Sequence, residues 1–242
     1  MLLSGIVRRL LMLAIVLAVP VIGGELLARK LVGEAVAAAV RARIGVSPQV
    51  SLGTSPILLQ LARGRIDDAT LHARGAHLGA LPAVTLTATL RDVHVTHLTR
   101  LQGAIGSLIV DAQLAPGAVR DLLATRRCID ALPPPVRTAL TRAPRVVLVR
   151  DRVELLPPAG RAVELRLRPQ VSRHVLRFRV SGLELAGAPA PAAALAAARA
   201  STSCARPLGD LPFGISLISA AARGGTLGLA FAATGATFSP LR

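Results

Sequence analysis

Apolar residues recur every four positions along the first long helix that the sequence predicts, Leu26–Ile44. The repeat is carried by Val32, Val36, Val40 and Ile44. This spacing puts the four side chains on one face of an α-helix, which can then be buried against another element. Gly45 follows directly, and a glycine is common just past the end of a helix.

A short helix that turns directly into a strand is predicted at Thr54–Leu71. Pro56 suits the first helical position, because its missing N–H loses no hydrogen bond there, and Gly64 marks the end. One face of the helix is apolar, with Ile57, Leu58 and Leu61. Beyond the glycine the period changes to two, which predicts a strand with one apolar face. Its inward residues are Ala69, Leu71 and Ala73.

The rest of the chain alternates between strand-like and helix-like spacing. Strands are predicted at Val84–Leu90, Ser107–Ala112, Val146–Val149, Val163–Leu167, Arg173–Val180, Leu211–Leu217 and Thr226–Ala233, the last two as a hairpin. Helices are predicted at Pro116–Arg127, Val136–Ala143 and Pro189–Ala200. The apolar phase flips near Arg91–Asp92, which predicts a β-bulge and a bent strand. We therefore expect an α+β fold, in which a curved, mostly antiparallel sheet wraps around the long N-terminal helix.

The N-terminal segment has the pattern of an export signal. Arg8 and Arg9 precede the apolar run Leu10–Gly23, and a basic segment before such a run is typical of a secretory leader. Because no clear small-residue cleavage site follows, we favour an uncleaved anchor over a cleaved leader. The positive-inside rule then places the two arginines in the cytoplasm. We expect an anchor at 1–24 and one extracytoplasmic domain at 25–242; the alternative is a buried helix of a cytosolic protein.

Composition and charge narrow the possible partners. The chain is 52% hydrophobic but only 2% aromatic, and its net charge is +16. The charge favours anionic partners, either anionic lipid or nucleic acid. The scarcity of aromatic rings, with no Trp or Tyr, nearly excludes binding by base stacking. Together with the export pattern, it disfavours nucleic acid.

Few residues are arranged for catalysis or metal binding. Asp67 and Asp68 are adjacent on a strand and so point to opposite faces, as do His94 and His97. We find no nucleophile motif, phosphate-cradling loop or metal-ligand spacing, so we predict neither an enzyme nor a cofactor. In an exported protein, the two cysteines, Cys128 and Cys204, favour one disulfide over two unpaired core residues.

Three segments carry a family resemblance: LARGRIDDATL at 61–71, LRDVHV at 90–95 and LPFGISL at 211–217. With their turns and strand phases, they resemble the LmeA-type phospholipid-binding proteins of the bacterial cell envelope, from about Glu25 to Phe238. The resemblance implies a tubular type of lipid-binding fold, phospholipid ligands that include phosphatidylinositol, and a role in maturing lipid-linked envelope glycans.

Our main hypothesis is an apolar groove for phospholipid, between the long helix and the curved sheet, in a protein that also contacts the membrane. The predicted lining is Val36, Val40, Ile57, Leu58, Leu61, Leu86, Phe213, Ile215, Leu229 and Phe231. Arg63 and Arg65 are the predicted headgroup ligands, since a guanidinium matches phosphate geometry. The alternatives are a scaffold that docks a partner through a basic strand face, an envelope glycan- or lipid-modifying enzyme, and a nucleic-acid binder. The sequence gives no indication of oligomeric state.

Overall fold

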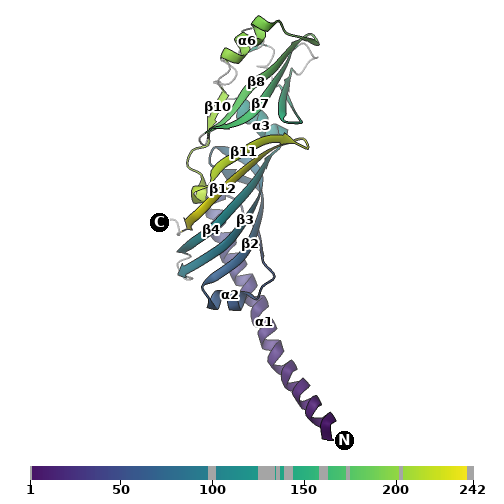
Figure 1. Cartoon of the computed structure of the whole chain (residues 1–242), viewed down its shortest axis with the longest axis vertical. Helices are drawn as coiled ribbons and strands as arrows, with labels where there is room; N and C mark the ends of the chain where they lie inside the picture. The colour runs from purple at the N-terminus through teal and green to yellow at the C-terminus, as the bar shows by residue number, and fades with distance from the viewer. Residues whose placement is uncertain are drawn as a thin grey trace.

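A long N-terminal helix lies against one of two antiparallel sheets in the computed structural model of the chain (Figure 1). The structure describes residues 2–97, 102–124, 134, 137–138, 144–157, 163–172, 175–201 and 204–238. Within these ranges, side chains are not described for residues 2–22, 82, 97 and 201. The helices are α1 (Leu2–Ile44), α2 (Ile57–Ala62), α3 (Pro116–Leu123) and α6 (Ala192–Ser201). In the part of the chain with described side chains, no helix combines the length and apolarity needed to cross a membrane.

The first sheet has the strand order β1-β2-β3-β4-β12-β11. Its strands are β1 (Gln49–Leu52), β2 (Arg65–Leu78), β3 (Leu81–His97), β4 (Gln102–Leu114), β11 (Ser216–Arg223) and β12 (Thr226–Phe238). The C-terminal hairpin β11–β12 therefore joins the N-terminal meander, because β12 pairs with β4. The inner face of this sheet is apolar and faces α1.

The second sheet, built by the middle of the chain, has the order β10-β8-β7-β6-β5. Its strands are β5 (Arg145–Val149), β6 (Arg152–Leu156), β7 (Val163–Ser172), β8 (Val175–Leu185) and β10 (Cys204–Pro207), with β9 (Ala188–Pro189) paired to β8. Strand β11 of the first sheet contacts β5, β6 and β7, and α3 contacts both sheets. The buried side chains of the two sheets form one core.

The α+β class, the long N-terminal helix and the antiparallel pairing are as predicted, although the strands form two open sheets instead of one. Helix α1 ends at Ile44 as predicted, with Gly45 at φ 80° donating its N–H to the Arg41 carbonyl at 2.9 Å. It begins much earlier than the predicted Leu26, at Leu2. The predicted helix at Val136–Ala143 lies mostly outside the described residues.

The predicted strand at Leu211–Leu217 is corrected at its start. Pro212–Gly214 forms a 3₁₀ turn, and β11 begins only at Ser216. Phe213 and Gly214 are consecutive residues with positive φ, 58° and 64°, so the chain is not extended at this point. Proline and glycine around Phe213 favour this turn over the extended chain.

The predicted phase flip on β3 exists, but it does not arise from an inserted residue. The pairs Ile66–Val93 and Asp68–Arg91 on β2 and β3 continue in one register, as do Val93–Ile105 and Arg91–Ser107 on β3 and β4. Instead, the alternation of buried and exposed side chains shifts at the same place in β2, β3 and β4. Buried side chains are three residues apart at Ile66 and Ala69, at Leu90 and Val93, and at Ile105 and Leu108.

We call this line across the sheet the bend row; it contains Asp67, Asp92, Gly106 and Gly235. Asp92 has φ 56° and Gly235 has φ 63°, so two of its residues lie in the left-handed region. A Cβ on Gly106 would approach the Cβ of Asp92 to 2.8 Å, so the close strand approach here requires a glycine. Because of this change of phase, the sheet has an apolar inner face on both sides of the bend row.

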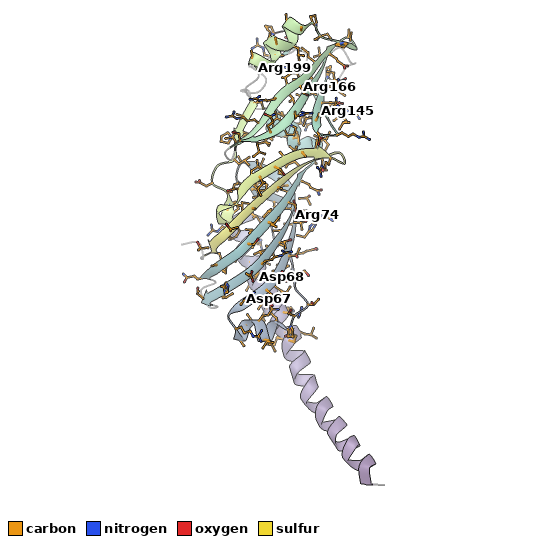
Figure 2. The ribbon with its side chains drawn as sticks, viewed as in Figure 1. Asp67, Asp68, Arg74, Arg145, Arg166 and Arg199 are labelled. Carbon is orange, nitrogen blue, oxygen red and sulfur yellow. The ribbon has the colours of Figure 1, made fainter. Side chains whose placement is uncertain are left out.

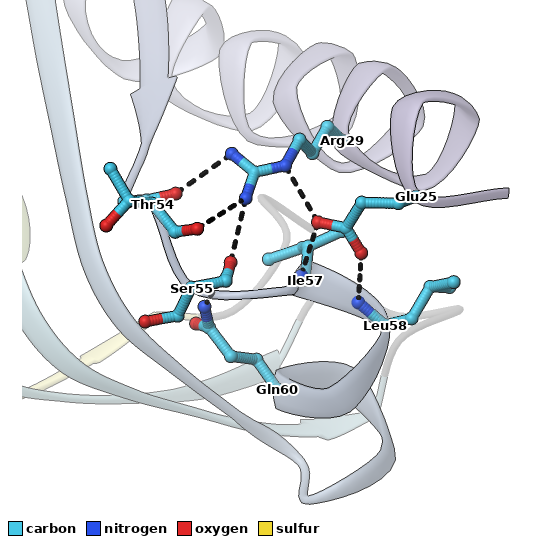
Figure 3. Close-up of polar contacts among 8 residues, drawn as sticks. Glu25, Arg29, Thr54, Ser55, Ile57, Leu58 and Gln60 are labelled. Atoms are coloured by element: carbon cyan, nitrogen blue, oxygen red, sulfur yellow. Dashed lines mark hydrogen bonds and ion pairs between the residues drawn. The ribbon is translucent and has the colours of Figure 1, made fainter. Parts of the chain in front are cut away.

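Helix α2 is held against α1 by Glu25, whose carboxylate caps its open end (Figure 3). Glu25 Oε1 accepts the Ile57 N–H at 2.6 Å, and Oε2 accepts the Leu58 N–H at 3.1 Å. These N–H groups begin a helix that has no cap from its own N-cap residue, Pro56. A side chain of α1 therefore completes the first turn of α2.

Arg29 extends the same network to the loop before α2 (Figure 3). It donates Nε to Glu25 at 2.8 Å and its guanidinium nitrogens to the carbonyls of Gly53 and Ser55, at 2.9 Å and 2.8 Å. The hydrogen bond from the Ile57 N–H, joined by those from Leu58 and Arg29, lowers the pKa of Glu25 below its ordinary value of 4.5. Glu25 and Arg29 thus fix the position of α1 relative to α2 and the loop before it.

We expect Glu25→Gln to lower the thermal midpoint of the protein at pH 7, because the neutral amide accepts these hydrogen bonds more weakly. A carboxylate whose pKa is lowered by folding stabilises the fold above its unfolded pKa and loses this effect as pH falls through the folded value. The difference between wild type and variant should therefore shrink below pH 4.5. Calorimetry across pH measures this, with the exposed Glu34→Gln on the same helix as control. A constant difference down to strongly acidic pH would contradict the capping role.

Candidate functional site

An apolar cavity of about 410 Å³ lies between the C-terminal half of α1 and the inner face of the first sheet. From α1 it is lined by Val36, Ala38, Ala39, Val40, Ala42, Arg43 and Ile44. From the rest of the chain it is lined by Leu71, Leu78, Leu86, Ala88, Leu90, Val93, Ile105, Leu108, Val110, Pro212, Phe213, Ile215 and Phe238. Its size falls within the range of small-molecule pockets.

The cavity exists because the helix face above the sheet is built of small side chains. Ala39 lies over a sheet floor that contributes large residues such as Leu86 and Leu90. An alanine face brings the helix backbone near the sheet but leaves the remaining volume unfilled. Ala38 and Ala42 line the cavity and are also exposed to solvent. The cavity therefore opens along this edge of α1.

Arg43 is the charged side chain among the described residues that line the cavity. It stands in the last turn of α1, with its guanidinium carbon 5.7 Å from the centre of the Phe213 ring. That distance allows a cation–π contact. Phe213 is held there by the 3₁₀ turn before β11, and its φ of 58° is one that a phenylalanine rarely adopts.

A second, more polar recess of about 740 Å³ shares Arg43 and Phe213 with the cavity. It is lined further by Leu211, Gly214, Ser216 and residues 232–237 of β12. Arg43 and Phe213 thus stand at the boundary between an apolar space and a polar one. Such a boundary suits a ligand with an apolar part and an anionic part.

The structure brings half of the predicted lining residues together at this cavity. Those that line it are Val36, Val40, Leu86, Phe213 and Ile215. The structure places the other five elsewhere. Ile57, Leu229 and Phe231 are core residues with 0%, 2% and 0% exposure. Leu58 and Leu61 lie on α2, outside the cavity lining.

The predicted helical face of α2 is corrected at Leu58, which is 42% exposed, while Gln60 is buried. Gln60 donates to the Ser55 carbonyl at 3.1 Å and accepts the Asp67 N–H at 2.8 Å. Because both ends of its amide are satisfied by local backbone, this glutamine can be buried. A polar side chain thus takes the place that the pattern assigned to a leucine.

Neither of the two predicted headgroup arginines lines the cavity. Arg65 forms ion pairs with Asp92 and with Asp67, the latter at 3.2 Å. Arg63 is exposed at the end of α2. Sequence reasoning missed Arg43 instead, although a signal was present: it follows Val36 by seven residues, which puts both on one helical face.

Asp67 and Asp68, both labelled in Figure 2, form ion pairs with different arginines. Asp67 pairs with Arg65, whereas Asp68 lies 3.8 Å from Arg91. Among the residues that the structure describes, no group of three or more His, Cys, Asp or Glu side chains could hold a metal ion. Cys204 is buried and disulfide-bonded. Its predicted partner, Cys128, lies outside the described residues, so the Cys128–Cys204 pairing stays a prediction.

A basic face does exist on the second sheet. Arg168 and Arg179 stand directly opposite each other on β7 and β8, and Arg177 is exposed on the same face. In the described part of the chain, none of the three forms an ion pair, although opposed like charges destabilise a sheet. Arg166, labelled in Figure 2, does form ion pairs. It contacts Glu164 at 2.8 Å and Glu184 at 2.6 Å, and the hydrogen bond to Glu164 raises its pKa.

An apolar cavity with a cationic side chain at its polar boundary has the chemistry expected of a protein that binds amphiphiles. A family model described as LmeA-like phospholipid-binding matches residues 23–232. The chain therefore belongs to the LmeA-like phospholipid-binding family. No curated protein and no solved structure matches it significantly.

We expect Ala88→Leu to fill part of the cavity at little cost in stability and to reduce the amount of bound lipid. The matched control is Ala73→Leu, because Ala73 is buried on the same face of the sheet but does not line the cavity. Overpacking a filled core costs about 1–3 kcal/mol, so the control should lose that much stability. Denaturant unfolding and native mass spectrometry measure both effects. Equal destabilisation by the two changes would mean that the cavity is not open space.

Proposed function

We propose that the protein binds single phospholipid molecules, with the acyl chains in the apolar cavity and the headgroup in the polar recess beside Arg43. The observation that carries this proposal is the shared boundary: Arg43 and Phe213 line both spaces. We further propose a preference for anionic phospholipids, phosphatidylinositol among them. This preference is supported by the guanidinium at the boundary, which matches a phosphate in charge and geometry.

Binding of this kind needs no catalytic group. Each methylene that leaves water for an apolar site contributes about 0.8 kcal/mol, so the chains supply most of the affinity. A charged hydrogen bond to the phosphate then fixes the position of the lipid in the cavity and distinguishes headgroups. We accordingly propose a binding protein that supports the maturation of envelope lipids or lipoglycans, and not an enzyme that modifies them. The family supports the lipid ligand.

We also propose that the chain is membrane-anchored, with residues 25–242 as one extracytoplasmic domain. The support is the sequence at the N-terminus, where Arg8 and Arg9 precede the apolar run Leu10–Gly23. Residues 2–23 are helical and continuous with the rest of α1. A helix of 22 residues spans about 33 Å, close to the thickness of a bilayer's hydrocarbon core.

Replacing Arg43 with Gln should weaken the binding of phosphatidylinositol by about tenfold, the order expected for loss of a charge-assisted hydrogen bond. Phosphatidylcholine should be affected less, since its headgroup has no net charge. Arg41→Gln is the matched control: it removes the same charge from an exposed position two residues away. Native mass spectrometry with defined lipid mixtures measures the preference. If Arg43→Gln bound both lipids like wild type, the headgroup assignment would fail.

The orientation predicts that a reporter fused after Arg242 is active outside the cytoplasm. Alkaline phosphatase, which requires disulfide formation, should be active in this fusion. A fluorescent reporter that matures only in the cytoplasm should be dark. The reverse result would overturn the anchored, extracytoplasmic arrangement without affecting the cavity.

A further inference from the structure

Five large apolar side chains are exposed at the end of the domain where α1 leaves it. We call them the leucine corner; they are Leu26, Leu27 and Leu31 on α1 and Leu58 and Leu59 on α2. Their exposed fractions run from 42% at Leu58 to 64% at Leu26. Isolated exposed leucines are ordinary, but contiguous ones mark an interaction surface.

The two parts of the corner form one surface, because α2 is fixed to α1 at this level. Glu25 binds the backbone of Ile57 and Leu58 directly. Gly24 also lies close to α2: a Cβ built on it would stand 3.6 Å from a terminal carbon of Leu58. The side chain of Leu58 therefore packs beside the helix that carries Leu27 and Leu31. Figure 3 shows this junction, with Glu25 reaching from α1 to the first turn of α2.

The position of the corner points to a bilayer as its occupant. Helix α1 passes α2 and continues away from the domain to its N-terminal end (Figure 1). The sequence of that extension is apolar between residues 10 and 23. The leucine corner is therefore continuous with the segment of the chain that is most compatible with lipid. Lys30 on α1 and Arg63, directly after α2, are exposed, and their charges complement an anionic surface.

The corner also lies on the same side of α1 as the opening of the cavity. Leu27, Leu31, Ala38 and Ala42 follow a spacing of four, seven and four residues, which keeps them on one helical face. All four are exposed, and Ala38 and Ala42 line the cavity. An apolar track therefore runs along α1 from the corner through Ala35 to the cavity opening, with the exposed Glu34 along one edge.

We propose that the leucine corner docks on the surface of a phospholipid bilayer and that the track on α1 guides acyl chains between that bilayer and the cavity. The guiding step rests on the proposed function, whereas the docking step does not. A second copy of this chain is the competing occupant of the corner.

The test uses the absence of tryptophan and tyrosine from the chain, which makes a single introduced Trp a clean fluorescence probe. The full chain carrying Leu59→Trp is reconstituted in vesicles of phosphatidylcholine and phosphatidylglycerol. Its emission should shift to the blue and be quenched when the phosphatidylcholine carries brominated acyl chains. Ile109→Trp is the control, because Ile109 is 45% exposed on β4, away from the corner; its emission should stay unquenched.

Two results would overturn docking. One is a Leu59→Trp emission that brominated lipid does not quench, or quenches no more than that of Ile109→Trp. The other is a blue-shifted, unquenched emission together with a chain that sediments as a dimer, which would assign the corner to a second copy.

A second measurement tests the track. Leu27→Ser combined with Leu31→Ser, both on the track, should slow the loading of phospholipid from donor vesicles severalfold while leaving the final amount bound and the thermal midpoint unchanged. Both side chains are exposed, so their replacement should not unfold the domain. Unchanged loading would remove the guiding role. If instead the wild type takes up no lipid but Leu59→Trp is still quenched, the cavity proposal fails and the docking surface remains.

Discussion

The structure depends on a mismatch of size between α1 and the sheet that it lies against. Protein interiors are normally filled to the density of organic crystals, and an unfilled apolar volume lowers stability. Here the helix face over the sheet contains Ala38, Ala39 and Ala42, while the sheet supplies leucines and valines. The helix can neither fill the space nor be displaced from it, because Val40 and Ile44 are buried in the core. A cavity therefore persists in the folded chain, and an acyl chain that enters it gains burial without displacing any side chain.

The bend row gives the sheet the shape that this arrangement requires. A flat sheet could place an apolar face against α1 along only part of its length. At Asp92 and Gly235 the backbone adopts positive φ, and the buried phase of neighbouring strands shifts together while the strands keep their register on both sides of the row. The polar residues of the row remain outside, where Arg65 bridges Asp67 and Asp92. Arg65, one of the two predicted headgroup ligands, thus makes its ion pairs at the bend of the sheet.

Local patterns predicted much of this fold, since they depend on residues close in sequence. The four-residue repeat of α1, the glycine stop at Gly45 and the alternation of β2 were read correctly. Contacts between residues far apart in the sequence could not be predicted from these local patterns. The pairing of β12 with β4 joins segments more than one hundred residues apart. The burial of Gln60 and the exposure of Leu58 likewise depend on Glu25 and on the Asp67 backbone, which lie outside the helix itself. The place of Arg43 beside the cavity could not be predicted because it depends on contact with Phe213, which a turn brings back from far along the chain.

One continuous helix connects the leucine corner with the cavity, so the spacing between them is fixed. Leu31 and Ala38 are seven residues apart, which corresponds to about 10 Å along the helix axis. Each leaflet contributes half of a hydrocarbon core of about 30 Å, so an acyl chain is about 15 Å long. With the corner docked, the end of a chain could reach the cavity opening while its other end was still in the bilayer. The Glu25–Arg29 network holds α2 at this level of α1, and so it sets where the corner lies relative to the opening. With the corner and the opening held at this spacing by α1 and by the hydrogen-bonded Glu25, the acyl chains would not have to pass completely through water.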